Sequence, residues 1–231
     1  MTTLVVNRVA VSEGDIRVKG RFMNSSPRLA PLTGIVFVVL LFLAFVVVEG
    51  ETPDIDDSAQ KITSFYNDDQ GKHIAAIVLV ALSTLFLAVF TVSLREFLRA
   101  PGGGDFWPNV VLVGGTACVA GLLVAVGVHL ALVEGGDKNI SPDAMVALNA
   151  IDADDFFAFA TPLGIMMLGA GGATLRAGAV LPRWMGWAAI VLFVVFFTPI
   201  GFAAFALSGI WIIVASVLMY QRGGAATPAT A

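Results

Sequence analysis

The feature that most limits how this chain can fold is its series of long uncharged apolar runs. The longest covers residues 184–221, where 38 consecutive residues include no Asp, Glu, Lys or Arg. A helix needs about 20 apolar residues to cross the roughly 30 Å hydrocarbon layer of a bilayer. Charged residues make up only 13% of the chain and hydrophobic ones 58%. One core cannot bury that much apolar surface, so we predict a polytopic membrane protein.

The apolar runs predict an all-α bundle with six membrane spans. The first four cover about 31–49, 73–94, 109–133 and 156–175. Residues 184–221 would form a helix of about 57 Å at ~1.5 Å per residue, too long for one crossing. A break at Thr198-Pro199-Ile200-Gly201 therefore predicts two short helices in a tight hairpin. Five spans with a broken last segment are the alternative.

The distribution of charge predicts the orientation. Lys and Arg accumulate in cytoplasmic loops of membrane proteins. With the amino terminus inside, ten of the thirteen Lys and Arg residues are cytoplasmic, whereas thirteen of the seventeen Asp and Glu residues are outside. We therefore expect both termini in the cytoplasm. The expected regions are a basic arm (1–30, a hairpin or disordered), a six-helix domain (31–222) and a disordered tail (223–231).

Two of the outer loops carry helix signals of their own. Ser58 can cap a helix that ends at Asn67, and Ser141-Pro142-Asp143 can begin a second one. In the second helix, Met145, Leu148 and Ile151 would share one face. We expect both to be short amphipathic helices on the outer surface.

Small residues at helical spacing predict close packing of the third and fourth spans. The set consists of Gly114, Cys118, Gly121 and Ala125 in the third span and Gly164 in the fourth. Small side chains let helix backbones approach one another in a membrane. A narrow substrate path along the same face is the alternative. No ionisable residue lies in the middle of a span, which disfavours proton-coupled or sodium-coupled transport.

Titratable groups gather at the outer rim of the predicted bundle. The candidates are His129, His73, Glu49, Asp154 and Asp155. His129 is expected to point into the bundle and to bond a carboxylate or a backbone carbonyl, and a metal or pH-sensing site is the alternative. Metal-ligand spacings such as His-x-x-His are missing, and Cys118 is the sole cysteine. We therefore expect no catalytic residues and no cofactor.

Three segments together resemble a known group of proteins. They are Ser64-Phe65-Tyr66-Asn67-Asp68-Asp69-Gln70-Gly71, the Ser141-Pro142-Asp143 helix start, and Leu181-Pro182-Arg183-Trp184-Met185-Gly186-Trp187. The chain resembles six-helix actinobacterial membrane proteins of unknown function over residues 30–222. Met185 replaces the usual Leu, and the long basic arm is not expected of that group. The resemblance implies a bacterial plasma membrane and no activity.

Three classes of function fit these observations. The leading hypothesis is a nonenzymatic accessory or scaffold subunit, because packing motifs occur without chemistry inside the spans. The alternative is a small carrier or channel for a neutral or lipophilic solute, and the third is an outer-face metal-binding enzyme or sensor. The expected partners are membrane lipids and either a membrane protein or a second copy of the chain, but not nucleic acid.

The predicted topology can be tested by cysteine labelling of intact cells. In a Cys118→Ala background, cysteines introduced at Asp57 and Asn139 should react with an impermeant maleimide, because both positions are predicted outside. A cysteine introduced at Gly103 should stay unlabelled until the cells are lysed. Labelling at Gly103 in intact cells, or none at Asn139, would contradict the six-span topology.

Overall fold

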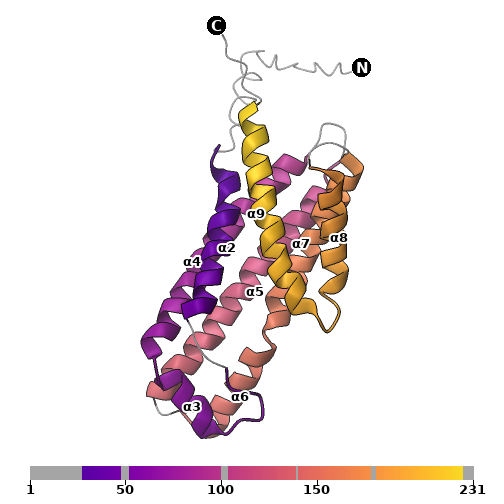
Figure 1. The fold of residues 1–231 in the computed structure, drawn as a ribbon. Helices are drawn as coiled ribbons and strands as arrows, with labels where there is room; N and C mark the ends of the chain where they lie inside the picture. Colours follow the sequence, from indigo (N-terminus) through magenta and orange to yellow (C-terminus); the bar gives the residue numbers. More distant parts are fainter. Residues whose placement is uncertain (1–27, 48–51, 100–103, 139, 178–180, 226–231) are drawn as a thin grey trace, which may run out of the picture.

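The computed structural model describes residues 28–47, 52–99, 104–138, 140–177 and 181–225 (Figure 1). These residues form an elongated helical bundle and include no strand. A short 3-10 helix, η1 (Ala30–Leu32), is followed by α2 (Thr33–Val47), α3 (Ala59–Asn67), α4 (Gln70–Leu98), α5 (Phe106–Asp137), α6 (Pro142–Asp154), α7 (Phe156–Ala177), α8 (Arg183–Val195) and α9 (Gly201–Ala225).

Five helical stretches of the described chain are long and apolar enough to cross a membrane. They are Ala30–Val47, Gln70–Leu98, Phe106–Gly136, Pro142–Arg176 and Gly201–Arg222. Many large hydrophobic side chains on the surfaces of these helices are exposed, and Phe42 and Leu85 are examples. Exposed apolar surface of this extent suits lipid rather than water. The prediction of a multi-pass, all-helical membrane protein is therefore supported.

The last apolar run is broken where the sequence predicted. The helix α8 ends at Val195 and α9 begins at Gly201, with Thr198 and Pro199 in the turn between them. The two helices are unequal, however, and the expectation that both are short is wrong for α9, which has 25 residues. It continues through Ala225 despite Gly223 and Gly224, so the first three residues of the predicted tail are helical. The rest of that tail and residues 1–27 of the arm lie outside the described residues.

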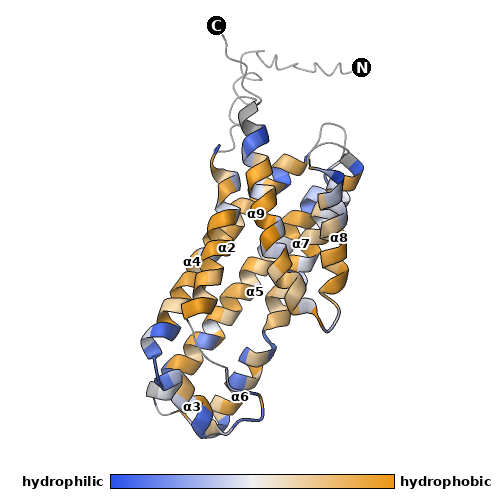
Figure 2. Ribbon diagram, in the orientation of Figure 1, coloured by the Kyte–Doolittle hydropathy of each residue, from blue (hydrophilic) through white to orange (hydrophobic). Residues whose placement is uncertain are grey.

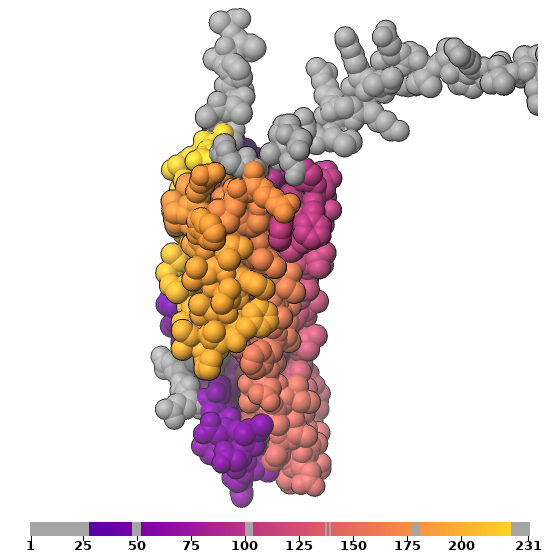
Figure 3. Space-filling model, turned by 90° about the vertical axis from the view of Figure 1, so that its right-hand side faces the viewer, coloured from indigo at the N-terminus to yellow at the C-terminus, as the bar shows by residue number. Residues whose placement is uncertain are grey.

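The helices do not all end at the same level (Figures 1 and 3). The helices α4 and α5 extend past the end of α2 and past the α8–α9 turn, and α3 and α6 lie across their ends. We call α3, α6 and these ends of α4 and α5 the cap. Hydrophilic residues are concentrated in the cap and at the opposite end of the bundle, with a hydrophobic zone between them (Figure 2). The cap thus has the composition of an extramembrane region.

The two cap helices begin at the predicted serines. The Ser58 hydroxyl accepts a hydrogen bond from the Lys61 backbone N–H, and the Ser141 hydroxyl accepts one from that of Ala144. The buried face of α6 differs from the prediction, because Met145 and Asn149 are buried whereas Ile151 is 54% exposed. The Asn149 amide donates to the backbone carbonyls of Pro53 and Asp54, at 3.4 and 3.1 Å. The polar Asn149 therefore faces inward to hold the segment before α3.

The closest helix packing joins α5 to α7 through glycine. A Cβ atom added to Gly114 would overlap the backbone of Met166, and one added to Gly121 would overlap the backbone of Ala158. Cys118, between them on this face, is fully buried. Of the other residues in the predicted packing set, Ala125 lines a cavity, and Gly164 lies against Phe196 at the end of α8 rather than against α5.

Substituting Gly121 should disturb this contact. We expect Gly121→Ala to destabilise the protein by about 1–3 kcal/mol, because the added methyl group meets backbone that cannot rotate away. Gly127→Ala, on the same helix, is the matched control, since nothing lies within 4 Å of its added Cβ. It should be neutral or slightly stabilising through helix propensity. Thermal melting in detergent measures both, and equal melting temperatures would contradict the α5–α7 contact.

Candidate functional site

The cap contains a chain of four polar side chains that ends on a backbone carbonyl. The Tyr66 hydroxyl on α3 donates to Asp152 Oδ2 on α6 at 3.1 Å. His129 Nδ1 on α5 lies 3.4 Å from the same carboxylate oxygen. The other ring nitrogen of His129, Nε2, lies 3.2 Å from His73 Nδ1 on α4, and His73 Nε2 lies 3.1 Å from the Phe65 carbonyl oxygen. We call these groups the polar chain; they connect four helices.

The acceptors in the polar chain determine where its protons lie. A carbonyl oxygen only accepts, so His73 Nε2 must carry a proton and donate to Phe65. Three contacts are involved: Asp152 with His129, His129 with His73, and His73 with the Phe65 carbonyl. Each contact needs one proton to be a hydrogen bond. Two neutral imidazoles supply only two. All three hydrogen bonds can therefore form together only with a third proton on Asp152, His129 or His73, and these three groups would then have a net charge of zero.

The surroundings of the polar chain keep water away from Tyr66 and His73. Tyr66 is fully buried and His73 is 3% exposed, while His129 and Asp152 are partly exposed. The rings of Phe65 and Tyr66 contact His73, and the Tyr66 ring also contacts His129 edge-on. Burial, followed by the neighbouring Asp152 carboxylate, raises the pKa of the Tyr66 hydroxyl. Tyr66 therefore keeps its proton and acts as a donor.

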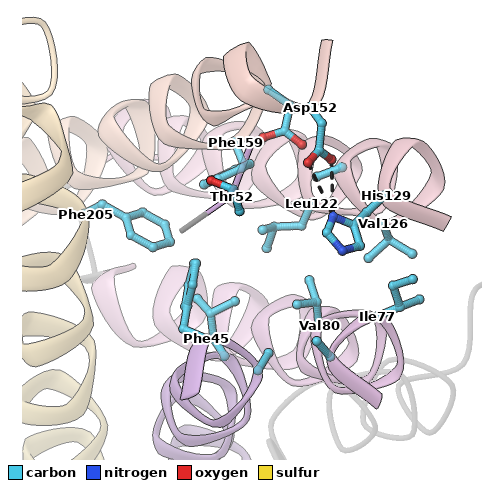
Figure 4. Close-up of a pocket in the computed structure, with 15 residues that line it drawn as sticks. Phe45, Thr52, Ile77, Val80, Leu122, Val126, His129, Asp152, Phe159 and Phe205 are labelled. Carbon is cyan, nitrogen blue, oxygen red and sulfur yellow. Dashed lines mark hydrogen bonds and ion pairs between the residues drawn. The ribbon is translucent and has the colours of Figure 1, made fainter. Parts of the chain in front are cut away.

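A cavity of about 430 Å³ lies beside the polar chain (Figure 4). His129, Asp152, Asp155 and Thr52 supply its polar groups. The rest of the lining is apolar: Leu41, Ala44, Phe45, Ala76, Ile77, Val80, Leu122, Ala125, Val126, Phe159 and Phe205. In Figure 4, Phe45, Val80 and Ile77 lie across the space from Phe159, Leu122 and Val126. The cavity therefore has one polar region and a long apolar wall.

A second cavity, of about 330 Å³, shares lining residues with the first. The shared residues are Phe45, Thr52, Asp152, Asp155, Phe159 and Phe205. Phe156 and Phe202 complete an aromatic wall with Phe159 and Phe205, in which the ring centroids are 5.4–6.5 Å apart. We refer to the two cavities together as the cap pocket. Its volume suits a small molecule with a hydrocarbon part.

The structure brings together only some of the residues singled out in the sequence. His73 and His129 are in direct contact, and Asp155 lines the cap pocket with His129. Asp154 is exposed and is not part of the pocket lining. Glu49 lies outside the described residues. The carboxylate that meets His129 is Asp152, which the sequence reasoning missed together with Tyr66.

The spacing of residues on α6 contains a signal for Asp152. Asp152 follows Met145 and Asn149 at steps of four and three, which is one face of a helix. Leu148 and Ile151 form a competing apolar stripe with Met145, and hydropathy alone favours that stripe. Tyr66 follows the buried Ile62 by four residues on α3, and no local pattern indicates that its hydroxyl reaches a carboxylate on α6.

The polar chain is not arranged as a metal site. A shared metal needs ligand atoms that point to one place, whereas His129 meets His73 with one ring nitrogen and Asp152 with the other. Within the described residues, no group of three or more His, Cys, Asp or Glu side chains could hold a metal ion. Hydrogen bonding explains the observed arrangement without a metal.

Comparison with known proteins identifies no relative for this chain. No family model matches it, and no curated protein or solved structure is similar to it. The resemblance to six-helix actinobacterial proteins stays an expectation. The function has to be inferred from the geometry of the cap.

Removing His129 should destabilise the cap. We expect His129→Leu to lower stability by about 1–3 kcal/mol, because Asp152 and His73 each lose a hydrogen-bond partner in a partly buried place. Asp154→Asn is the control, since Asp154 is close in sequence but outside the polar chain. Thermal melting in detergent measures both variants. If His129→Leu melts at or above the wild-type temperature, the polar chain does not stabilise the cap.

Proposed function

We propose that this protein is a carrier for a lipophilic solute and that the cap pocket is its binding site. The observation behind this proposal is the lining of the pocket, which combines an apolar wall with a few convergent polar groups. That combination is typical of small-molecule sites. The accessory-subunit hypothesis has no comparable feature among the described residues, and the linear polar chain does not favour a metal enzyme.

The level of the pocket in the bundle supports access from lipid. The α8–α9 turn exposes Phe197, Ile200 and Phe202, each to more than 60%. Three large apolar side chains so exposed would be unfavourable in water, so we place this turn at the edge of the hydrocarbon layer. Phe202 and the partly exposed Phe45 also line the pocket. A lipophilic solute could therefore enter sideways, between the hydrocarbon and the cap.

The proposed topology has six crossings, with the cap outside the plasma membrane. The described chain begins and ends at the same end of the bundle, opposite the cap (Figure 1). An even number of crossings fits this arrangement, with α8 and its turn forming a short fifth crossing. Arg95 and Arg99, near the end of α4, lie at the end opposite the cap. Basic residues there favour a cytoplasmic location for that end.

A photoreactive probe tests the binding site. The protein in phosphatidylcholine vesicles is labelled with a ten-carbon alcohol that carries a diazirine, and the labelled peptides are identified by mass spectrometry. We expect labelling of pocket peptides, and a loss of about 5-fold or more in Val126→Phe, which fills the cavity. Val124→Phe is the matched control, because Val124 is on the same helix but is 57% exposed.

Two outcomes would contradict the carrier proposal. One is labelling confined to lipid-facing peptides outside the pocket. The other is equal pocket labelling in both valine variants, provided that both are folded by circular dichroism. A protein partner copurified at constant stoichiometry, in the absence of pocket labelling, would favour an accessory subunit instead.

A further inference from the structure

Asp155 is the carboxyl group in the cap pocket that has no hydrogen-bond or ion-pair partner among the described residues. It lies between α6 and α7, is partly buried, and lines both cavities. Its carboxylate makes no hydrogen bond or ion pair with any described residue. A carboxylate removed from water is costly unless a cation or a donor replaces its hydration. This position is therefore suited to a ligand group that is positive or donates hydrogen bonds.

The neighbouring charges do not provide that partner. With the polar chain fully bonded, Asp152, His129 and His73 together carry no net charge, because the third proton balances the Asp152 carboxylate. Tyr66 donates a hydrogen bond to Asp152 and is neutral. Neither Lys nor Arg is among the residues that line the two cavities. The pocket therefore has a net negative charge at its polar end whenever Asp155 is ionised.

The aromatic wall adds a second attraction for positive charge. Phe156, Phe159, Phe202 and Phe205 line the second cavity, which Asp155 also lines. The faces of aromatic rings attract cations, and the attraction is stronger where water is excluded. An anionic head group would meet the carboxyl groups of Asp152 and Asp155, and the lining offers it neither Lys nor Arg.

We propose that the solute is an amphiphilic cation, with an ammonium group against Asp155 and its hydrocarbon part along the apolar wall. This inference rests on the carrier function proposed above and adds the chemical class of the solute. The hydrocarbon part would lie among residues such as Leu41, Val80 and Leu122 at the apolar end of the pocket. A site of this kind selects a head group by charge and a tail by burial.

Three diazirine probes with the same ten-carbon chain test the preference. They end in an ammonium, a hydroxyl or a carboxylate, and each is titrated against the protein in phosphatidylcholine vesicles, which have no net surface charge. We expect the ammonium probe to label pocket peptides at a concentration about tenfold below that of the carboxylate probe. Val126→Phe should reduce pocket labelling by the ammonium and hydroxyl probes alike.

Adjacent aspartates provide the matched variants. Asp155→Asn should bring the ammonium-to-carboxylate ratio close to one, whereas Asp154→Asn should keep the wild-type ratio because Asp154 is exposed and outside the pocket lining. Asp155→Glu keeps the charge and should restore most of the preference. Circular dichroism and thermal melting establish that each variant is folded before labelling.

The possible failures can be told apart. If the hydroxyl probe labels the pocket in a Val126-dependent way but wild-type protein shows no preference for ammonium, the cation proposal is overturned and the carrier proposal stands. An unchanged preference in folded Asp155→Asn would also overturn the role of Asp155. If no probe labels the pocket, the carrier proposal fails, and the cation proposal fails with it.

Discussion

The backbone contact between α5 and α7 determines how the cap is assembled. Gly114 and Gly121 allow the two helices to approach more closely than any side chain would permit. Only Asp155 separates α6 from α7, so the position of α7 also fixes where α6 ends in the cap. His129 on α5 and Asp152 on α6 can meet because of this approach. The polar chain therefore depends on glycines about two and four helical turns away from His129 along α5.

The cap and the pocket follow from a difference in helix length. At ~1.5 Å per residue, the 29 residues of α4 and 32 of α5 are longer than a bilayer core requires, whereas α2 has 15 and α8 has 13. The long helices therefore extend beyond the short ones. The cap helices cover their ends, and the cap pocket lies where the short helices stop. A polar region next to an apolar wall is the expected result at this level, because the environment changes from lipid to water there.

Asp152 on α6 and Asp155 directly after that helix have different hydrogen-bonding partners and therefore different roles. Asp152 accepts a hydrogen bond from Tyr66 and lies within hydrogen-bond distance of His129, so its carboxylate has partners within the protein. Asp155, three residues later, lines the cavity without such partners. One carboxylate thus stabilises the cap, and the other is left for a ligand. This difference is the physical basis for proposing a cationic solute.

The sequence by itself determined the membrane class, the approximate helices, the capping serines and the break before α9, because hydropathy, helix caps and proline act locally. It also placed His73 and His129 at one end of the bundle. Tertiary structure alone decided that, among the described carboxylates, Asp152 rather than Asp154 would be the partner of His129. The rotation of α6 made that choice: Met145 belongs both to an apolar stripe with Leu148 and Ile151 and to a mixed stripe with Asn149 and Asp152. Hydropathy favours the apolar stripe. The mixed stripe is buried instead, because Tyr66 and His129 contact Asp152, and Asn149 donates to the Asp54 carbonyl. These contacts join positions too distant in sequence for local patterns to indicate.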